Sequence, residues 1–194
     1  MIRFFDIFLS IIGLVLLSPV FILICIWVKL DSKGAVFYKQ IRVGINNVDF
    51  ELIKFRTMQK NSEQKGLLTI GERDSRITKS GFYIRKYKID ELPQLINVLK
   101  GEMSIVGPRP EVRKYVNYYT DEQKKILFVK PGITDVASIK YSNENEILKK
   151  HNDPEKAYIE IIMLDKIQLN MKYISNYSIS NYFKIIFLTI KCLF

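Results

Sequence analysis

An uninterrupted apolar segment opens the chain and dominates its hydrophobic pattern. From Ile7 to Val28 no charged residue occurs. At about 1.5 Å per helical residue, this stretch is long enough to cross a hydrocarbon core of roughly 30 Å. It is longer than the apolar region of a signal peptide, and no small-residue cleavage site follows it. We therefore expect residues 1–30 to form a membrane helix that stays attached to a domain at 31–194.

Ser18 and Pro19 lie at the centre of this segment and predict a break in the helix. Proline removes a backbone donor, and a neighbouring serine hydroxyl can bond to the freed backbone group. A simple spanning helix should show a clear imbalance of cations, yet basic residues occur on both sides: Arg3, Lys29, Lys33, Lys39 and Arg42. A re-entrant helix with both ends on one face explains both features. A spanning helix and a buried helix of a soluble protein are the alternatives. Asp6 is expected to pair with Arg3 near the interface.

The next part of the chain has the pattern of a small sheet followed by a loop. Ala35 to Arg42 and Val48 to Thr57 predict two strands around a turn at Gly44 to Asn47. Residues 59–79 are mostly polar and predict a loop with little core of its own.

Helical spacing returns in the middle of the chain. Apolar residues follow the i, i+3, i+4, i+7 pattern at Leu92, Leu95, Ile96 and Leu99. We expect Asp90 to be the N-cap of this helix, Pro93 to lie in its first turn and Gly101 to end it. Thr120 and Gln123 have the spacing of a capping box. They predict a second helix that stops before Lys130-Pro131-Gly132.

The C-terminal part is expected to be helical as well. Helical spacing runs from Pro154 to about Ile174. The tail from Tyr182 to Phe194 is apolar except for a thin polar stripe. In this tail Lys184 and Lys191 are seven residues apart, on nearly the same helical face. The tail is too short to span and fits a helix lying in the membrane interface. The pattern as a whole predicts an α+β fold, with helix-rich architecture, one short β-hairpin and amphipathic interfacial helices at the C-terminus.

Composition narrows the class of protein and of partner. Of the 194 residues, 48% are hydrophobic and 26% are charged, which excludes a disordered chain. Cys25 and Cys192 lie in apolar stretches, and they indicate neither a disulfide framework nor a metal site. His151 stands in a turn-like setting and is expected at the surface. The net charge of +10 indicates an anionic partner: nucleic acid, anionic lipid or a phosphorylated substrate.

Two adjacent carboxylates are the first candidates for chemistry. Asp90 and Glu91 follow three cations, Arg85, Lys86 and Lys88, at a predicted helix start. Nearby cations and a helix N-terminus both favour ionised carboxylates. A fixed aspartate of this kind can attack phosphorus or bind Mg²⁺. An N-cap followed by an ordinary first-turn glutamate is the alternative.

Two further segments offer cations for phosphate. Pro108 and Pro110 restrict the turn that presents Arg109, whose guanidinium is suited to bidentate phosphate binding. Lys54 and Arg56 end the second predicted strand. A surface turn and a solvated strand edge, respectively, are the alternatives.

Taken together, the motifs resemble the bacterial sugar transferase family, the monotopic phosphoglycosyl transferases that initiate surface-glycan assembly. The likeness runs through nearly the whole chain. It rests on elements that occur in family order: Arg3, Asp6 and Ser18-Pro19; Val36 to Gly44; Lys54 to Met58; Arg76 to Thr78; Asp90 to Leu95; Met103 to Glu111; and Lys130 to Thr134. The absence of further spanning helices before this part resembles the short, catalytic-core form of the family.

Three positions depart from the family pattern. Asp135 stands where glycine is usual, Ser138 where glutamine is usual and Ser75 where proline is common. We expect these changes to affect the sugar pocket more than the phosphate chemistry.

The resemblance implies a reaction and its partners. Asp90 attacks the sugar-bearing phosphate of a UDP-sugar, UMP leaves, and undecaprenyl phosphate then takes the sugar phosphate from the enzyme. Glu91 is a metal ligand or an orienting group, Mg²⁺ is the cofactor, and Arg109, Arg85, Lys54, Arg56, Pro108 and Pro110 form the substrate and phosphate site. The donor sugar is expected to be an N-acetylated amino sugar, and a homodimer is compatible with the pattern.

The same resemblance places the protein at the cytoplasmic face of the bacterial inner membrane, in contact with lipid and not with nucleic acid. Two rivals remain. One is direct transfer in a ternary complex in which Asp90 only holds metal. The other is a membrane-tethered basic module that binds nucleic acid or anionic lipid without catalysis.

Overall fold

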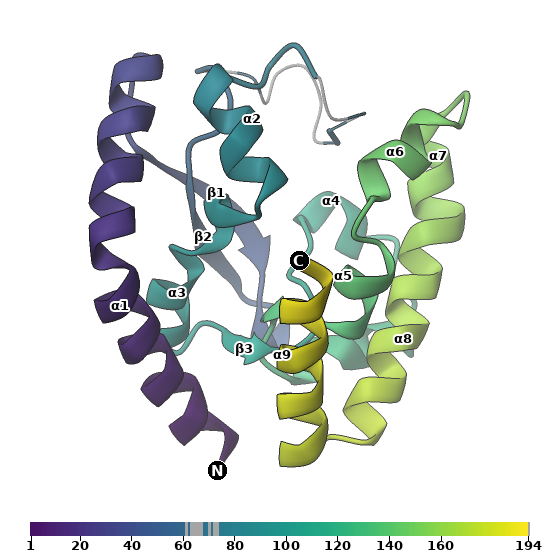
Figure 1. Ribbon diagram of the computed structural model, residues 1–194. Helices are drawn as coiled ribbons and strands as arrows, with labels where there is room; N and C mark the ends of the chain where they lie inside the picture. The colour runs from purple at the N-terminus through teal and green to yellow at the C-terminus, as the bar shows by residue number, and fades with distance from the viewer. Residues whose placement is uncertain (61, 63–67, 70, 72–73, 194) are drawn as a thin grey trace.

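The long apolar segment forms one helix along the side of the molecule. The computed structural model describes residues 1–60, 62, 68–69, 71 and 74–193, without the side chain of residue 193. Helix α1 (Ile2–Asp31) is continuous, and it is the one described helix long and apolar enough, by length and composition, to cross a membrane. Figure 1 shows α1 on one side, α8 (Met163–Ser175) on the opposite side, and the β-hairpin with α9 (Ile179–Leu193) between them. The expected α+β class is confirmed.

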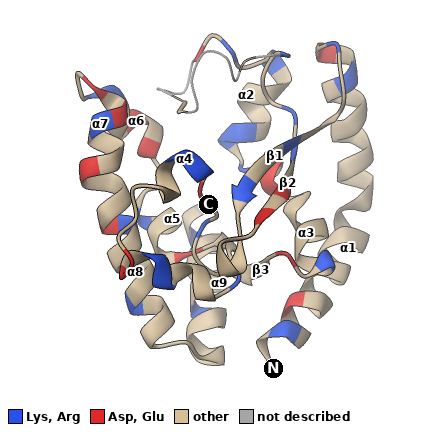
Figure 2. Ribbon diagram, turned by 180° about the vertical axis from the view of Figure 1, so that it is seen from behind, with Lys and Arg blue, Asp and Glu red and all other residues tan. Residues whose placement is uncertain are grey.

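Pro19 is accommodated inside α1 without ending it. Its missing N–H would have bonded to the Val15 carbonyl, and the Ser18 hydroxyl donates to that oxygen instead, at 2.8 Å. The expected role of Ser18 is thus confirmed, while re-entry into the membrane stays a prediction. Between charged ends, α1 is uncharged along its middle (Figure 2).

Helix α1 packs on the rest of the protein through one face only. Ile24 and Val28 are buried against Phe55 and Ile84. Its other face leaves large apolar side chains exposed: Phe4, Phe8, Ile11, Val15, Leu16, Ile22, Leu23, Ile26, Trp27 and Leu30. The expected Arg3–Asp6 pair does not form. Arg3 donates instead to the Val98 and Leu99 carbonyls at the end of α3 (Gln94–Lys100), at 2.6 and 3.0 Å.

The predicted hairpin is present. Strands β1 (Phe37–Val43) and β2 (Asp49–Phe55) pair antiparallel, with Phe37 opposite Phe55 and Val43 opposite Asp49. The turn contains the 3-10 helix η1 (Ile45–Asn47), with Asn46 and Asn47 at positive φ, which asparagine tolerates better than most residues.

The predicted central helix is present with a different start. A 3-10 turn, η3 (Ile89–Glu91), precedes α3, whose N-cap is Pro93. The expectation that Asp90 caps α3 is therefore wrong, because the tight turn places Asp90 before the helix. Gly101 ends α3 with φ of 89°, the left-handed conformation that glycine adopts readily.

The loop expected at 59–79 falls partly outside the described residues. Its end is fixed by Thr78, which caps α2 (Lys79–Lys86) by accepting from the Gly81 N–H. The capping box is confirmed, since Thr120 N–H donates to Gln123 Oε1 and Gln123 N–H donates to Thr120 Oγ1. The helix that follows is the 3-10 helix η4 (Gln123–Phe128).

A second, parallel sheet is present that the hydrophobic pattern did not predict. It pairs β3 (Ser104–Val106) with β4 (Gly132–Thr134). Short helices follow: α4 (Arg113–Val116) after β3, then α5 (Val136–Lys140) and α6 (Glu144–Lys149) after β4. The helical stretch expected from Pro154 consists of α7 (Pro154–Ala157), η5 (Tyr158–Ile162) and α8. The main core packs these helices on the end of β1, with Val43 among its buried residues.

Arg56 holds the C-terminal end of α1 to the hairpin. Its guanidinium donates to the carbonyls of Lys33 at 3.0 Å and Ser32 at 2.7 Å, and to the Ser32 hydroxyl at 3.0 Å. Ser32 is the C-cap of α1 and Lys33 follows it, so their carbonyls have no partner within the helix. The Arg56 side chain therefore satisfies groups that would otherwise be left unbonded beside the protein surface.

We predict that Arg56→Met destabilises the fold by about 2–4 kcal/mol, because several hydrogen bonds to a charged donor are lost and their acceptors remain partly buried. The matched control is Lys39→Met in β1, whose ammonium is exposed in a surface ion pair with Glu51; it should change stability by less than about 1 kcal/mol. Denaturant unfolding in detergent measures both variants. Equal stabilities of the two would show that the Arg56 contacts contribute nothing.

Candidate active site

Two adjacent carboxylates lie in the 3-10 turn η3, but only one of them is bound. Arg109 donates to both oxygens of Glu91, at 2.8 Å from NH1 to Oε2 and through NH2 to Oε1. Lys54 Nζ lies 3.2 Å from the same Oε1. Within the part of the chain that the structure describes, no donor bonds to the Asp90 carboxylate, and Asp90 as a whole residue is 7% exposed. Glu91 is thus fixed between two cations, whereas Asp90 makes no comparable contact with the described residues.

The surroundings push the pKa values of the two carboxyls apart. Burial would by itself raise the pKa of Glu91, but Arg109 and Lys54 hold this pKa well below its usual range. The pKa of Asp90 is raised by burial and by the negative charge of Glu91, against the opposing effect of Lys54, Arg85 and Arg109. Neighbouring carboxylates with different pKa values are typical of sites in which the two have different roles.

The cations of the site come from three different elements. Lys54 is near the end of β2, Arg85 is in the last turn of α2 and Arg109 follows β3. Burial lowers the pKa of Lys54, although Glu91 acts in the opposite direction. Arg85 donates to Thr69 Oγ1 at 3.1 Å. The Arg109 side chain is 35% exposed, so its guanidinium can meet a ligand from the solvent side.

Two glycines allow the turn before Arg109 to cross the second sheet closely. A Cβ on Gly132 would lie 2.1 Å from the Gly107 nitrogen, and a Cβ on Gly107 would lie 2.4 Å from the Lys130 carbonyl oxygen. Gly107 N–H donates to the Thr134 carbonyl at 3.1 Å. Only residues without a side chain fit at this crossing, which fixes where Arg109 leaves the sheet.

Asp135, one of the departures from the family pattern, holds the same turn from the other side. Its Oδ2 accepts from the Arg109 N–H at 3.1 Å and from Asn170 Nδ2 at 2.8 Å, and its Oδ1 accepts from the Ser138 N–H at 2.5 Å. It therefore caps α5 and positions the Arg109 backbone. The sequence signal was the departure itself, because an acidic residue after Thr134 needs buried partners, whereas Asn170 carried no signal.

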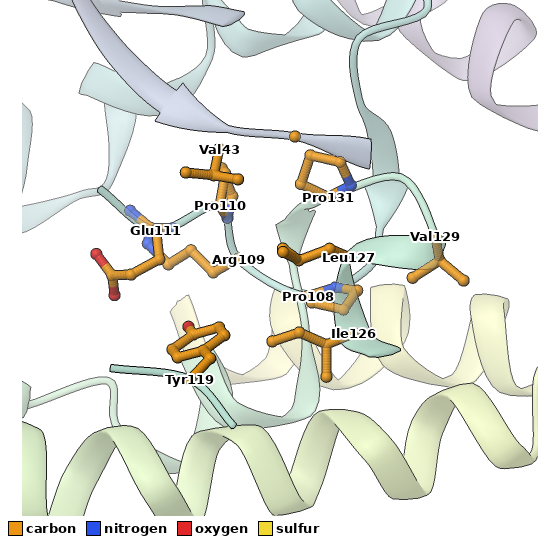
Figure 3. Close-up of a pocket in the computed structure, with 11 residues that line it drawn as sticks. Val43, Pro108, Arg109, Pro110, Glu111, Tyr119, Ile126, Leu127, Val129 and Pro131 are labelled. Atoms are coloured by element: carbon orange, nitrogen blue, oxygen red, sulfur yellow. The ribbon is translucent and has the colours of Figure 1, made fainter. Parts of the chain in front are cut away.

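The predicted prolines border a mostly apolar hollow beside Arg109 (Figure 3). Val43 and Pro131 lie on one side of it, and Tyr119 and Ile126 on the other. Pro108, Pro110 and Glu111 also line it. Burial and the charge of Glu111 raise the pKa of Tyr119, so this phenol stays neutral.

Most predicted site residues are brought together, and one is not. Asp90, Glu91, Lys54, Arg85 and Arg109 influence one another's charge. Arg56 is instead bound to the end of α1. Lys54 and Arg56, which the sequence analysis treated alike, therefore have different surroundings: Lys54 contacts Glu91, and Arg56 contacts the end of α1.

The donor set can be compared with the needs of Mg²⁺. Among the described residues, no three His, Cys, Asp or Glu side chains gather closely enough to hold a metal ion. Magnesium commonly binds one or two carboxylates together with water and substrate phosphates. Asp90 fits this arrangement, whereas both Glu91 oxygens already accept from Arg109.

Comparison with known proteins identifies the family. A family model described as bacterial sugar transferase matches residues 1–194. The chain belongs to the bacterial sugar transferase family. Its similarity to named relatives, together with the long apolar α1, indicates association with a membrane.

Three relatives illustrate the range of the family. The chain is 38% identical over 192 residues to a UDP-N-acetylgalactosamine-undecaprenyl-phosphate N-acetylgalactosaminephosphotransferase of Aeromonas hydrophila, covering 97% of this chain and 42% of that protein. It is 36% identical over 189 residues to a UDP-glucose:undecaprenyl-phosphate glucose-1-phosphate transferase of Escherichia coli, covering 95% and 38%. It is 39% identical over 189 residues to the uncharacterized sugar transferase EpsL of Bacillus subtilis, covering 97% and 85%. The chain thus spans about two fifths of the first two proteins.

Proposed function

We propose that this protein transfers a sugar 1-phosphate from a UDP-sugar to undecaprenyl phosphate and releases UMP. The observation that carries the proposal is the Asp90 carboxylate, to which none of the described residues donates, next to Glu91 fixed by Arg109 and Lys54. The named relatives support the choice of donor and acceptor classes.

The reaction proceeds in two displacements at phosphorus. An Asp90 oxygen attacks the phosphate that bears the sugar, and the bond from this phosphorus to the oxygen of UMP breaks. An oxygen of undecaprenyl phosphate then attacks the same phosphorus, and the bond to Asp90 breaks, which restores the carboxylate. The acceptor phosphate is already ionised near neutral pH, so neither step needs a strong base. Arg109, Lys54 and Arg85 stabilise the negative charge.

Mg²⁺ is the proposed cofactor. Asp90 would hold it together with the diphosphate of the donor, and the ion would neutralise charge on the leaving UMP. Glu91 acts as the orienting group for Arg109, since both of its oxygens accept from that guanidinium.

The donor is proposed to carry an N-acetylated amino sugar. The Aeromonas relative is named for such a donor, and the E. coli relative is named for glucose. A panel of both kinds of UDP-sugar decides between them.

The membrane arrangement follows from the exposed apolar faces. We propose that α1 is re-entrant, with both ends at the cytoplasmic face of the inner membrane, because each basic flank favours the anionic cytoplasmic leaflet. Helix α9 exposes Phe183, Phe187, Leu188 and Ile190 and lies in the interface on the same side. The site would then stand at the level of the lipid phosphates.

Asp90→Asn should lower the rate of UMP release about a thousandfold or more, because an amide cannot replace a carboxylate nucleophile. The control is Asp121→Asn, whose carboxylate is 99% exposed and should leave the rate unchanged. UMP release from a UDP-sugar panel with undecaprenyl phosphate measures both. Wild-type protein incubated with donor alone should carry a phosphosugar adduct. Turnover without an adduct would favour direct transfer, and no UMP from any donor would favour a binding module.

The pH dependence tests the electrostatic roles. Asp90 must be ionised to attack, so kcat/KM should rise with pH through its pKa. Glu91→Gln removes the negative charge that raises this pKa. The acid limb of the pH profile of kcat/KM should therefore move to lower pH. Lys54→Met removes a cation and should move the limb to higher pH. The control, Glu122→Gln, is remote and exposed. Limbs that coincide in all four proteins would exclude Asp90 as the group that titrates.

The topology of α1 can be tested by cysteine labelling. In a variant with Cys25 and Cys192 replaced by serine, a cysteine at position 2 should resist a membrane-impermeant reagent in intact spheroplasts. Asp121→Cys in the same background serves as the cytoplasmic control. Replacement of Pro19 by leucine should favour a straight spanning helix and make position 2 reactive. Labelling of position 2 with Pro19 intact would show that α1 spans.

A further inference from the structure

The two ends of the chain meet at a buried carboxylate in α1. Asp6 Oδ1 accepts three hydrogen bonds: from Tyr182 OH at 2.8 Å, from Ser104 Oγ at 2.9 Å and from the Ile105 N–H at 2.9 Å. Asp6 is 2% exposed and Tyr182 is fully buried. One oxygen therefore joins α1, α9 and strand β3.

Helix α9 also binds the second strand of the parallel pair. Thr134 in β4 and Thr189 in α9 have their hydroxyl oxygens 2.7 Å apart. The Thr189 hydroxyl donates to the Ile185 carbonyl within α9, at 2.8 Å. Because a hydroxyl has only one hydrogen, Thr134 donates to Thr189. The helix thus touches β3 through Asp6 and Tyr182, and β4 through Thr189.

Both strands end at the residues that hold Arg109. Strand β3 runs directly into Gly107-Pro108-Arg109, and β4 runs directly into Asp135, which accepts from the Arg109 N–H. A shift of either strand would move the guanidinium relative to Glu91. Catalytic geometry is sensitive to displacements of about 1 Å.

We propose that α9 is a positioning element of the site, and that Tyr182 and Thr189 align the β3–β4 pair so that Arg109 meets the phosphate of the substrate. This inference rests on the proposed function for its kinetic part. Tyr182 and Thr189 do not touch the reacting atoms; they act through the strands. The opposite face of α9 is apolar and exposed (Phe187 and Ile190), so a helix in contact with lipid would set the geometry of the site.

The packing of α9 alone does not account for these contacts. Apolar residues such as Ile185 and Ile186 already fix the helix against Val106 and Val136. The hydroxyls of Tyr182 and Thr189 add directional contacts. Tyr182 donates to the Asp6 oxygen that β3 also binds, and Thr189 accepts from Thr134 of β4. Substitutions that remove only an oxygen separate alignment from burial.

The test uses the full-length protein in phospholipid nanodiscs. Tyr182→Phe and Thr189→Val remove one hydroxyl each at similar volume, Thr189→Ser keeps the hydroxyl, and Ser180→Ala removes an exposed hydroxyl on the same helix. We expect kcat to fall about tenfold in Tyr182→Phe and Thr189→Val, with the KM of the donor changed less than twofold. Thr189→Ser and Ser180→Ala should match the wild type.

Hydrogen–deuterium exchange gives a readout that does not need turnover. Peptides covering 104–110 and 132–138 should exchange faster in Tyr182→Phe and Thr189→Val, while a peptide covering 49–55 should be unchanged. Wild-type kcat and wild-type exchange in both variants would overturn the inference and leave the proposed function standing. Faster exchange in a protein that never releases UMP would support the alignment and sink the proposed function. A loss in Thr189→Ser equal to that in Thr189→Val would assign the effect to packing.

Discussion

The double contact of Arg109 with Glu91 is the constraint on which the site depends. Adjacent carboxylates in one turn would repel each other and share protons unless something made them different. Arg109 and Lys54 make Glu91 the anionic member, and its charge in turn raises the pKa of Asp90. The clamp therefore has two effects: it fixes the guanidinium of Arg109, and it gives the two neighbouring carboxyls different pKa values.

The sequence predicted most of the residues at this site because charge and rigidity are local properties. Two carboxylates after three cations, and an arginine between two prolines, can be read from neighbours in the chain. Arg56 looked equivalent to Lys54 in the sequence, but the structure places its guanidinium on the Lys33 and Ser32 carbonyls. Strand β2 ends at Phe55, so side-chain alternation fixes the direction of Lys54 but not of Arg56. The partners of Arg56 are backbone carbonyls at the end of α1, and no pattern of side chains in the sequence predicts them.

In the fold, too, the elements that depend on neighbouring residues were predicted, and those that depend on residues far apart in the chain were not. The hairpin, the α3 helix with its Gly101 end and the capping box at Thr120 each depend on residues a few positions apart, and all were predicted. Strands β3 and β4 have three residues each and pair across a long separation, so alternation could not reveal them. Asp90 was misplaced as an N-cap because a 3-10 turn and the first turn of an α-helix favour the same residues.

Asp6 shows why the ends of the chain and the site form one structure. A carboxylate in an apolar helix is costly to bury unless donors surround it, and its three donors come from β3 and from α9, up to 176 positions away. Asp6 therefore ties the packing of α1 to β3, the strand that runs into Arg109. Helices α1 and α9 both turn apolar faces outward, so in the proposed membrane arrangement their position in lipid would set the depth of the site. The height of Asp90 above the membrane and the alignment of Arg109 are then consequences of the same set of contacts.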